Sequence, residues 1–316
     1  MAIVLAFGAA LSNALTTIFQ RIGVQTAPAD SAMRWRLVAH LLRRPVWFLG
    51  FATMLVGFAL QALALGRGSL SVVQPIMVSE LVFVVVILRV WFRRPLGVRE
   101  VVGTSLTVLG LASFLAVSDQ SLGASVPSTG AWRVSIALCA GAILVACLLA
   151  RRGSRPWRSA AFGFGAAVAF ALCAAFTKTA TILYSGGFFP LFGHFETYGI
   201  AVSGLMGMFL AQNAFYSGPI TASQASLTIV DPIVSIALGI AMFGDRLRDA
   251  PGDIALETVA ILGMVAGLFV LCHSPLIVGA ATHERLTRRA PATAAPVPGP
   301  PGPELVAEPR SPTPSA

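Results

Sequence analysis

The sequence is poor in charged residues. Only 11% of its 316 residues are charged, and lysine occurs once, at Lys178. A soluble globular domain carries about 25% charged residues, so this composition excludes an ordinary soluble protein. The sequence also lacks a His-Glu-x-x-His motif, a phosphate-binding glycine loop, a Ser/His/Asp set and a long soluble segment that could hold a cofactor. We therefore expect neither an enzyme nor a bound cofactor.

Cysteine is also scarce. The sequence contains four, at Cys139, Cys147, Cys173 and Cys272. All four lie in apolar stretches and lack the spacing of a metal site. We expect them to pack between helices as small hydrophobic residues, and no metal ligand set can be named.

Long apolar runs are what the sequence has in abundance. Hydrophobic residues make up 56% of it, and the mean hydropathy is +0.81. A helix needs about 20 apolar residues to cross the hydrocarbon core of a bilayer. Nine stretches reach or approach this length: residues 2–20, 46–66, 69–92, 98–118, 131–150, 157–184, 196–216, 219–243 and 254–273. The sequence therefore predicts an all-α integral membrane protein with about nine transmembrane helices.

The positive net charge of +9 comes from arginines in the gaps between these stretches. They do not gather on a soluble module, which argues against nucleic acid as a partner. If the N-terminus lies outside the cell, fifteen arginines fall in cytoplasmic gaps and four in external gaps. Cytoplasmic loops of membrane proteins carry the excess of Lys and Arg. We therefore predict a multi-pass plasma-membrane protein with an N-out/C-in orientation and a cytoplasmic C-terminal tail.

The two halves of the sequence repeat. Residues 7–21 align with residues 164–178, and at an offset of 150 Gln74 aligns with Gln224. Each half then contains four apolar stretches, and the odd stretch between them inverts the second half relative to the first. Such a 4+1+4 inverted repeat is typical of secondary transporters, whose site lies near the bilayer midplane between the repeats. The predicted divisions are a first transmembrane repeat at 1–118, a connector with a central transmembrane helix at 119–156, a second transmembrane repeat at 157–275 and a disordered Pro-rich tail at 276–316.

Two acidic residues lie near the middle of apolar stretches, Glu80 in 69–92 and Asp231 in 219–243. A carboxylate at the bilayer centre costs about 2.5 to 3.5 kcal/mol on insertion scales. A chain that retains two such residues in corresponding parts of its halves is expected to use them. They indicate a membrane transport site.

Asp231 belongs to a polar stripe. Gln224, Thr228, Asp231 and Ser235 share one helical face, and lipid could not satisfy these groups, so the stripe must face protein or a water-filled cavity. The alternative is a seam of hydrogen bonds between packed helices. Because Asp231 is ionisable and precedes Pro232, which frees a backbone carbonyl, the cavity interpretation is favoured.

Glu80 has only apolar neighbours on its own helix, which favours the neutral, protonated form. We hypothesise that Glu80 carries a coupling proton while Asp231 contacts cargo or a cation. The alternative is a neutral, hydrogen-bonded glutamic acid without a role in transport.

The first apolar stretch carries a second polar stripe of Asn13, Thr16, Thr17 and Gln20. It is predicted either to line the transport path, which the amides and hydroxyls suit, or to form a packing seam. Gln74 precedes Pro75, and Pro75 and Pro232 are expected to kink or interrupt their helices.

Lys178 is predicted either to pair with Asp231 or Glu80 in the pathway, or to extend towards the outer membrane interface. Gly263 and Gly267 form a Gly-x-x-x-Gly pattern, for which helix packing is the default explanation and a homodimer contact the alternative.

Several short motifs resemble one known family. The second half contains Asp231-Pro232, then Phe243-Gly244-Asp245-Arg246-Leu247, then Gly263 and Gly267, and the first half contains Gln74-Pro75, then Phe92-Arg93-Arg94-Pro95-Leu96, then Gly103 and Gly110. Over residues 1–273 this pattern resembles the drug/metabolite transporter superfamily with its EamA-like repeats. The departure is at Pro95, where the acidic residue of the turn is missing. The stretch from Gly68 to Leu96 and the span count also resemble the NIPA-like magnesium transporter branch.

The resemblance and the polar stripes together predict a secondary active transporter. It would work by alternating access, coupled to protons, and move a small polar or amphipathic metabolite. The alternatives are a magnesium or divalent-cation transporter of the NIPA-like kind and a non-transporting membrane scaffold or sensor. The expected partners are the lipid bilayer, a small-molecule or ion cargo and, in one interpretation, a second copy of the chain.

Overall fold

The computed structural model describes residues 1–25, 45–93, 95–118, 126–183, 193–245 and 251–276. Two compact units divide the chain, Met1–His283 and Glu284–Ala316. The second unit, with most of the predicted tail, lies outside the described residues. The features below belong to the first unit.

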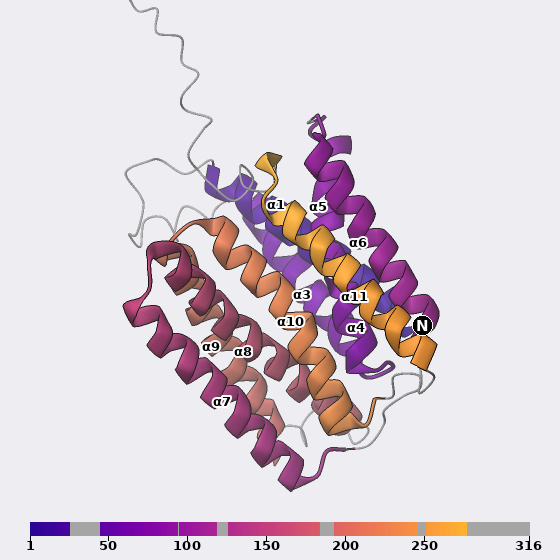
Figure 1. The fold of residues 1–316 in the computed structure, drawn as a ribbon, viewed down its shortest axis with the longest axis vertical. Helices are drawn as coiled ribbons and strands as arrows, with labels where there is room; N and C mark the ends of the chain where they lie inside the picture. The colour runs from indigo at the N-terminus through magenta and orange to yellow at the C-terminus, as the bar shows by residue number, and fades with distance from the viewer. Residues whose placement is uncertain (26–44, 94, 119–125, 184–192, 246–250, 277–316) are drawn as a thin grey trace, which may run out of the picture. The chain divides into compact units, whose positions relative to one another are not determined.

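The described residues of this unit form helices and contain no strand. The helices are α1 Ala2–Gln25, α3 Pro45–Leu65, α4 Leu70–Met77, α5 Ser79–Val90, α6 Val98–Val117, α7 Thr129–Arg152, α8 Arg155–Leu183, α9 Phe195–Ser217, α10 Ile220–Phe243 and α11 Pro251–Cys272 (Figure 1). With α4 and α5 taken as one interrupted segment, each of the nine predicted stretches corresponds to one of these elements.

Eight of these segments are long and apolar enough to cross a membrane, counted within the described residues. The remaining one, α9, has 23 residues but carries Gln212 and Asn213 near its end, which lowers its apolar content. Buried positions alternate with lipid-compatible exposed ones on most helices; for example, Leu138 and Leu144 of α7 are exposed while Cys139 is buried. These features are those of a multi-pass helical membrane protein.

Proline interrupts one of the two helices in which an interruption was predicted. The segment containing Pro75 breaks at Val78, where α4 ends and α5 begins, and the Val78 N–H bonds to the Pro75 carbonyl at 3.2 Å. In contrast, α10 continues through Pro232 as one helix. A proline removes one helical hydrogen bond, and whether the helix breaks depends on the packing around it.

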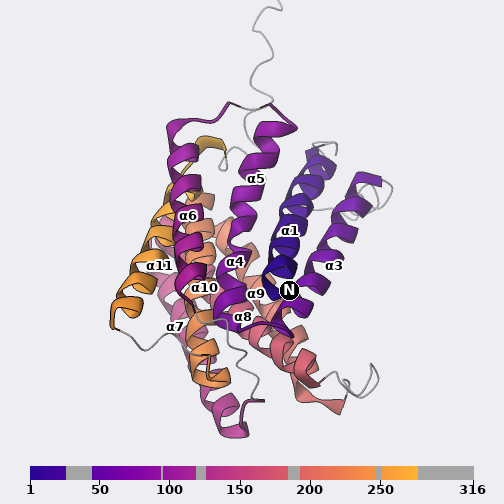
Figure 2. The same ribbon diagram turned by 90° about the vertical axis from the view of Figure 1, so that its right-hand side faces the viewer.

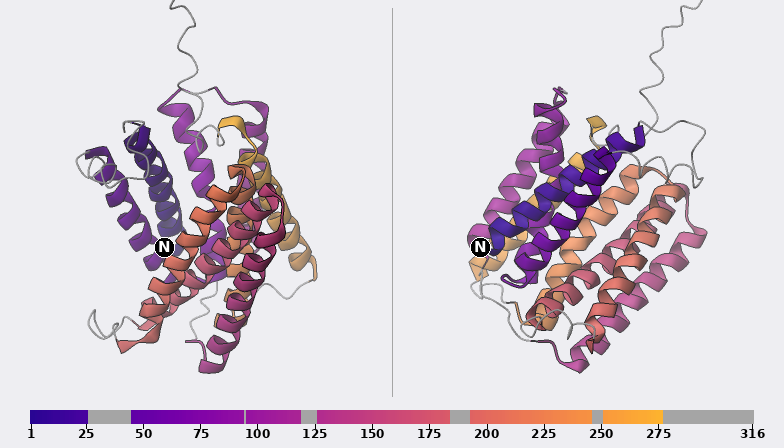
Figure 3. Two further views of the ribbon diagram at one scale, coloured as in Figure 1. Left: turned by 90° about the vertical axis from the view of Figure 1, so that its left-hand side faces the viewer. Right: turned by 180° about the vertical axis from the view of Figure 1, so that it is seen from behind.

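The helices of the two halves pack in the same order. In the first half α1 packs on α3, in the second α8 packs on α9, and both pairs are visible in Figures 2 and 3. Figure 1 shows α10 between the α7–α9 group and α11. The last helices of the halves, α6 and α11, pack against each other, and α4 packs on α10. The most extensive contacts between the halves are thus made by corresponding elements.

Glycine allows α6 and α11 to approach closely. A Cβ added to Gly267 would lie 2.5 Å from the backbone nitrogen of Thr107, and one added to Gly110 would lie 2.5 Å from that of Met264. At Gly263 the nearest atom, the Cα of Gly110, is 3.9 Å away. Gly267 therefore packs within the chain. The homodimer contact stays a prediction.

This difference predicts unequal effects for two similar substitutions. Gly267→Ala should lower the thermal unfolding temperature in detergent, because a methyl group without space costs about 1–3 kcal/mol. Gly263→Ala is the matched control in the same helix and should leave the unfolding temperature unchanged or raise it slightly, since alanine favours helix formation. Equal effects of the two substitutions would contradict this packing.

Candidate functional site

A cavity of about 570 Å³ lies between the two halves. Its lining comes from α1, α3, α4 and α5 of the first half and from α8, α9 and α10 of the second. The polar lining residues are Asn13, Gln61, Gln74, Glu80, Thr177, Gln224, Thr228 and Asp231. Phe58, Phe170, Met77 and Met208 are among the apolar ones. A largely apolar cavity of this size with a few polar groups suits a small-molecule ligand.

Corresponding positions of the two halves line this cavity. At the offset of 150, five pairs of lining residues match: Phe58 and Met208, Gln74 and Gln224, Met77 and Leu227, Val78 and Thr228, and Leu81 and Asp231. The two carboxyl groups do not occupy corresponding positions of the halves, because Asp231 matches Leu81 and not Glu80. The two acidic residues thus share one cavity but occupy different environments.

The contact between the first two helices of each half is also repeated. A Cβ on Gly57 of α3 would lie 2.5 Å from Asn13 Oδ1 of α1, and one on Gly207 of α9 would lie 2.7 Å from the ring of Phe170 in α8. Gly57 matches Gly207 at the offset of 150, and Asn13 matches Phe170 in the alignment of α1 with α8. In each half, a glycine on one helix therefore leaves space for a cavity-lining side chain of the neighbouring helix. This side chain is polar in the first half and aromatic in the second.

Asp231 has an unsatisfied oxygen. Its Oδ1 is buried and has no hydrogen-bond partner among the described residues. Because Pro232 has no N–H, the helix already has an unpaired carbonyl one turn before it, at Thr228, which also lines the cavity. A buried carboxylate oxygen without a partner costs free energy, so this position suits a proton or a cationic group of a bound ligand.

Glu80 has polar partners that its own helix did not reveal. It lies in the first turn of α5, just after the break at Val78, and its Oε1 accepts a hydrogen bond from Thr17 Oγ1 at 3.2 Å. Asn13 also lies within hydrogen-bonding reach of the carboxyl group. The neighbours of Glu80 along α5 are apolar, but α1 supplies polar groups across the helix interface.

The polar stripe of α1 forms hydrogen bonds with two neighbouring helices. Asn13 and Thr17 approach Glu80, whereas Thr16 Oγ1 donates to Thr53 Oγ1 of α3 at 3.0 Å. Both predicted roles are thus present, a packing seam at Thr16 and contact with the cavity at Asn13. The side chain of Gln20 lies outside the described part of the chain.

The stripe of α10 is only partly exposed to the cavity. Gln224, Thr228 and Asp231 line it, and Gln224 Nε2 donates to Thr228 Oγ1 at 3.4 Å. Ser235, the last member of the stripe, is fully buried and is not among the lining residues.

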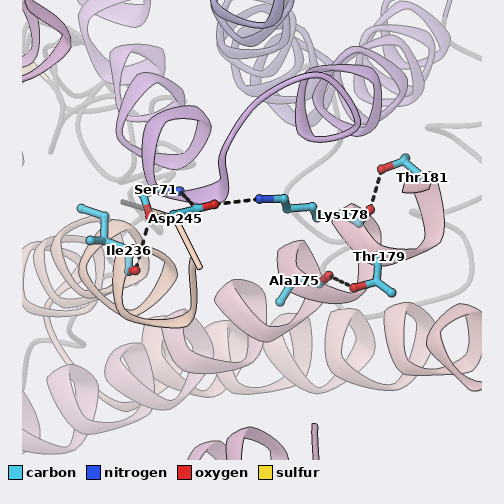
Figure 4. A network of polar contacts seen from close by, with 7 residues as sticks. All are labelled: Ser71, Ala175, Lys178, Thr179, Thr181, Ile236 and Asp245. Carbon is cyan, nitrogen blue, oxygen red and sulfur yellow. Dashed lines mark hydrogen bonds and ion pairs between the residues drawn. The ribbon is translucent and has the colours of Figure 1, made fainter. Parts of the chain in front are cut away.

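Lys178 forms an ion pair that neither prediction anticipated. Its Nζ lies 3.1 Å from Asp245 Oδ1, and the two side chains are 2% and 3% exposed. Figure 4 shows the Lys178 amine directed at this carboxylate. The same Nζ lies 4.3 Å from the centre of the Phe243 ring. Pairing with Asp231 or Glu80, and extension to the membrane interface, are therefore both wrong for this residue.

Local backbone structure brings Asp245 to this position. Gly244 ends α10 in the left-handed conformation with φ of 64°, and the Asp245 N–H then bonds to the Gly239 carbonyl at 3.1 Å. Asp245 Oδ2 accepts two 3.0 Å hydrogen bonds from Ser71, one from its N–H and one from its Oγ. Ser71 lies in the first turn of α4, so a carboxylate of the second half caps a helix of the first.

Sequence reasoning missed four polar residues of this region. Gln61 lines the cavity from α3 and Thr177 from α8, and Asp245 and Ser71 complete the buried ion-pair cluster. The signal for Gln61 was a lone amide in an apolar stretch. The signal for Asp245 was a single lysine inside an apolar stretch, which requires a nearby acid.

No family model matches this chain, and no solved structure matches it. The chain is similar to an uncharacterized protein of Corynebacterium glutamicum, with 26% identity over 280 residues. The match covers 87% of this chain and 95% of that protein, so it extends over nearly the whole of both.

Proposed function

We propose that the chain is a secondary active transporter of the drug/metabolite transporter kind. In this proposal nine spans form a 4+1+4 inverted repeat in the plasma membrane, N-out and C-in, and the repeats rock around the cavity in alternating access. The observation that carries the proposal is the cavity between the halves, which corresponding positions of both halves line and which contains two carboxyl groups.

The lining favours a neutral or cationic solute over an anion. Two carboxyl groups and four Gln or Asn amides supply hydrogen-bond acceptors, and no Lys or Arg is among the lining residues described. The aromatic rings of Phe58 and Phe170 supply apolar and cation-binding surface. We therefore propose a small amphipathic solute, with a basic or neutral polar end, as cargo.

The carboxyl groups receive different proposed roles. Asp231, with its unpartnered oxygen, would contact the cargo. Glu80, held by Thr17, would carry the coupling proton. A proton carrier must be stable in both protonation states, and the hydroxyl of Thr17 can donate to the carboxylate or accept from the neutral acid.

A divalent-cation transporter is the second candidate, and one observation favours it. Both carboxyl groups line one cavity, together with the amide oxygens of Asn13, Gln74 and Gln224. Magnesium prefers oxygen ligands and keeps several waters, so one or two carboxylates can suffice. Among the described residues, however, no group of three His, Cys, Asp or Glu side chains could hold a metal ion.

Reconstitution into liposomes tests the proposal. We expect an imposed pH gradient to drive uptake of an amine or other amphipathic solute from a test panel, with proton movement reported by an internal pH dye. Glu80→Gln should uncouple solute uptake from the pH gradient. Asp253→Asn, an acidic residue of α11 outside the cavity, is the matched control and should behave as wild type.

The same vesicles separate the alternatives. Magnesium uptake that is independent of the pH gradient and lost in both Glu80→Gln and Asp231→Asn would favour the cation transporter. If no solute or ion crosses, and deletion of residues 276–316 abolishes the cellular function while Glu80→Gln and Asp231→Asn do not, the chain is a scaffold or sensor.

A further inference from the structure

Three buried residues join the two repeats at one end of the helices. Lys178 near the end of α8 and Asp245 just after α10 belong to the second repeat, and Ser71 at the start of α4 belongs to the first. We call these three the end cluster. Figure 4 shows Asp245 between Lys178 and Ser71. All three are at most 5% exposed, and Ser71 Oγ lies 3.4 Å from the Ile236 carbonyl of α10.

The end cluster is a strong contact because it is charged, buried and fully paired. One oxygen of Asp245 accepts a hydrogen bond from the Lys178 ammonium group. The other accepts two hydrogen bonds from Ser71 at the N-terminus of α4. Hydrogen bonds to ionised groups are about twice as strong as neutral ones. Lys178 and Asp245 belong to the same repeat, so separating the repeats would keep their ion pair and break the two hydrogen bonds from Ser71 to Asp245.

Glycine allows α4 and α10 to meet at this point. A Cβ on Gly239 of α10 would lie 2.5 Å from Asp245 Oδ2 and would also meet the Ser71 hydroxyl. At the same end, a Cβ on Gly66 after α3 would lie 3.1 Å from Thr181 Cβ of α8. The two repeats are therefore closely packed where α3 and α8 end and α4 begins.

Towards the opposite end the repeats are joined by α6 and α11, where Glu100 Oε1 accepts a 2.7 Å hydrogen bond from Ser274 Oγ, and not by the cavity-lining helices. There α5 continues beyond the break at Val78, and it packs on α1, α4 and α6 of its own repeat. Within the described residues, α1 and α5 form no extensive packing with α8, α9 or α10. Contact between the cavity-lining parts of the repeats is thus concentrated at the end that carries the end cluster.

The sequence explains why the opposite end has no matching cluster. The alignment of residues 7–21 with 164–178 places Arg21 opposite Lys178, and the turn Phe92–Leu96, which corresponds to Phe243–Leu247, contains Pro95 and no acidic residue. The cation is present in both repeats, but the acid exists only in the second. Proline can neither form an ion pair nor accept a hydrogen bond through its side chain.

We propose that the end cluster is a one-sided gate, which closes the cavity at the end where α4 begins and holds the resting transporter closed there. The inference rests on the proposed alternating access, because a gate has meaning only if the repeats move. It assigns Lys178, Asp245 and Ser71 as residues that set which end is open, rather than as residues that touch cargo.

Distances between spin labels test the gate in the full-length protein reconstituted in nanodiscs. The four native cysteines are replaced by alanine. One label pair, Arg67→Cys with His194→Cys, spans the end that carries the cluster, and another, Trp91→Cys with Tyr216→Cys, spans the opposite end. These four positions are exposed. In the otherwise unchanged chain we expect one dominant short distance between the labels at 67 and 194.

Asp245→Asn should raise the ratio of open to closed molecules at this end about tenfold or more. This factor corresponds to the free energy of one hydrogen bond to a charged group. Pro95→Asp should have the opposite effect and shorten the distance between 91 and 216, because it supplies an acidic residue in the turn after α5, where the sequence has none. Gly239→Ala keeps both charges, but its added methyl group would occupy the space where Ser71 and Asp245 meet. It should therefore open the gate as Asp245→Asn does. Gly141→Ala, where a Cβ meets nothing within 4 Å, is its control.

The outcomes distinguish the gate from the transport proposal. If folded Asp245→Asn and Gly239→Ala both keep the unmodified distance distributions while added solutes still produce two conformations, the gate is wrong and alternating access stands. If no variant or solute produces a second distance at either end, alternating access itself fails. If Asp245→Asn does not fold, Gly239→Ala and Pro95→Asp decide the result.

Discussion

Replacing Asp231 by asparagine is expected to abolish coupled transport and at the same time to stabilise the folded protein. The two effects have one physical cause. Oδ1 of Asp231 is buried without a partner among the described residues, so its ionised form costs stability in the absence of cargo. Asparagine keeps the shape but removes the charge that cargo would satisfy. We expect binding of a cationic solute to weaken about 10- to 100-fold, as for the loss of one hydrogen bond to a charged group.

Two measurements on the same preparation check this prediction. Solute uptake in liposomes should fall to the level of empty vesicles, while the unfolding temperature in detergent stays equal or rises. Ser235→Ala is the matched control, because Ser235 lies one turn further along the polar stripe of α10 but does not line the cavity. It should leave uptake near wild type. A fall in unfolding temperature for Asp231→Asn, with uptake retained, would show that Asp231 is a structural residue.

The helices could be predicted from the sequence because their signal is local. Apolar stretches of about 20 residues are recognisable without knowledge of their neighbours. The break near Pro75 was also predictable, since the missing N–H belongs to the residue itself. That Pro232 leaves α10 unbroken was not, because the packing of neighbouring helices decides it.

The cavity was partly predictable through the repeat. Aligning Gln74 with Gln224 relates two positions that prove to line the same cavity. The helix that faces each residue was not predictable. The sequence showed only the apolar neighbours of Glu80 along its own helix, because a pattern along one helix says nothing about the polar groups of α1 across from it.

The partner of Lys178 was missed for a related reason. A buried lysine requires an acid, and the sequence offered Glu80 and Asp231 as the acids inside apolar stretches. Asp245 lies instead in the turn after α10, and it reaches Lys178 because Gly244 adopts a left-handed conformation. The position of a turn residue in space depends on its backbone angles, which residue type alone indicates only weakly.

Removing Lys178 alone is expected to destabilise the protein more than removing its charge together with that of Asp245. Lys178→Met would leave the Asp245 carboxylate buried without its counter-ion, which costs about 3–5 kcal/mol in a closed environment. In the double variant Lys178→Met/Asp245→Asn no charge is buried, and the asparagine oxygen can still accept the hydrogen bond from the Ser71 N–H. Most of the lost stability should therefore return.

Unfolding of all four proteins of this cycle, under one set of detergent or nanodisc conditions, measures the coupling between the two residues. We expect the double variant to be more stable than Lys178→Met by about 2 kcal/mol or more, the larger part of the penalty for an unpaired buried charge. Arg67→Met, at an exposed position of the same end, controls for the loss of a positive charge as such. Strict additivity of the two single effects would show that Lys178 and Asp245 do not stabilise each other, and the ion pair could then not hold Asp245 in place for its contact with Ser71 of the first repeat.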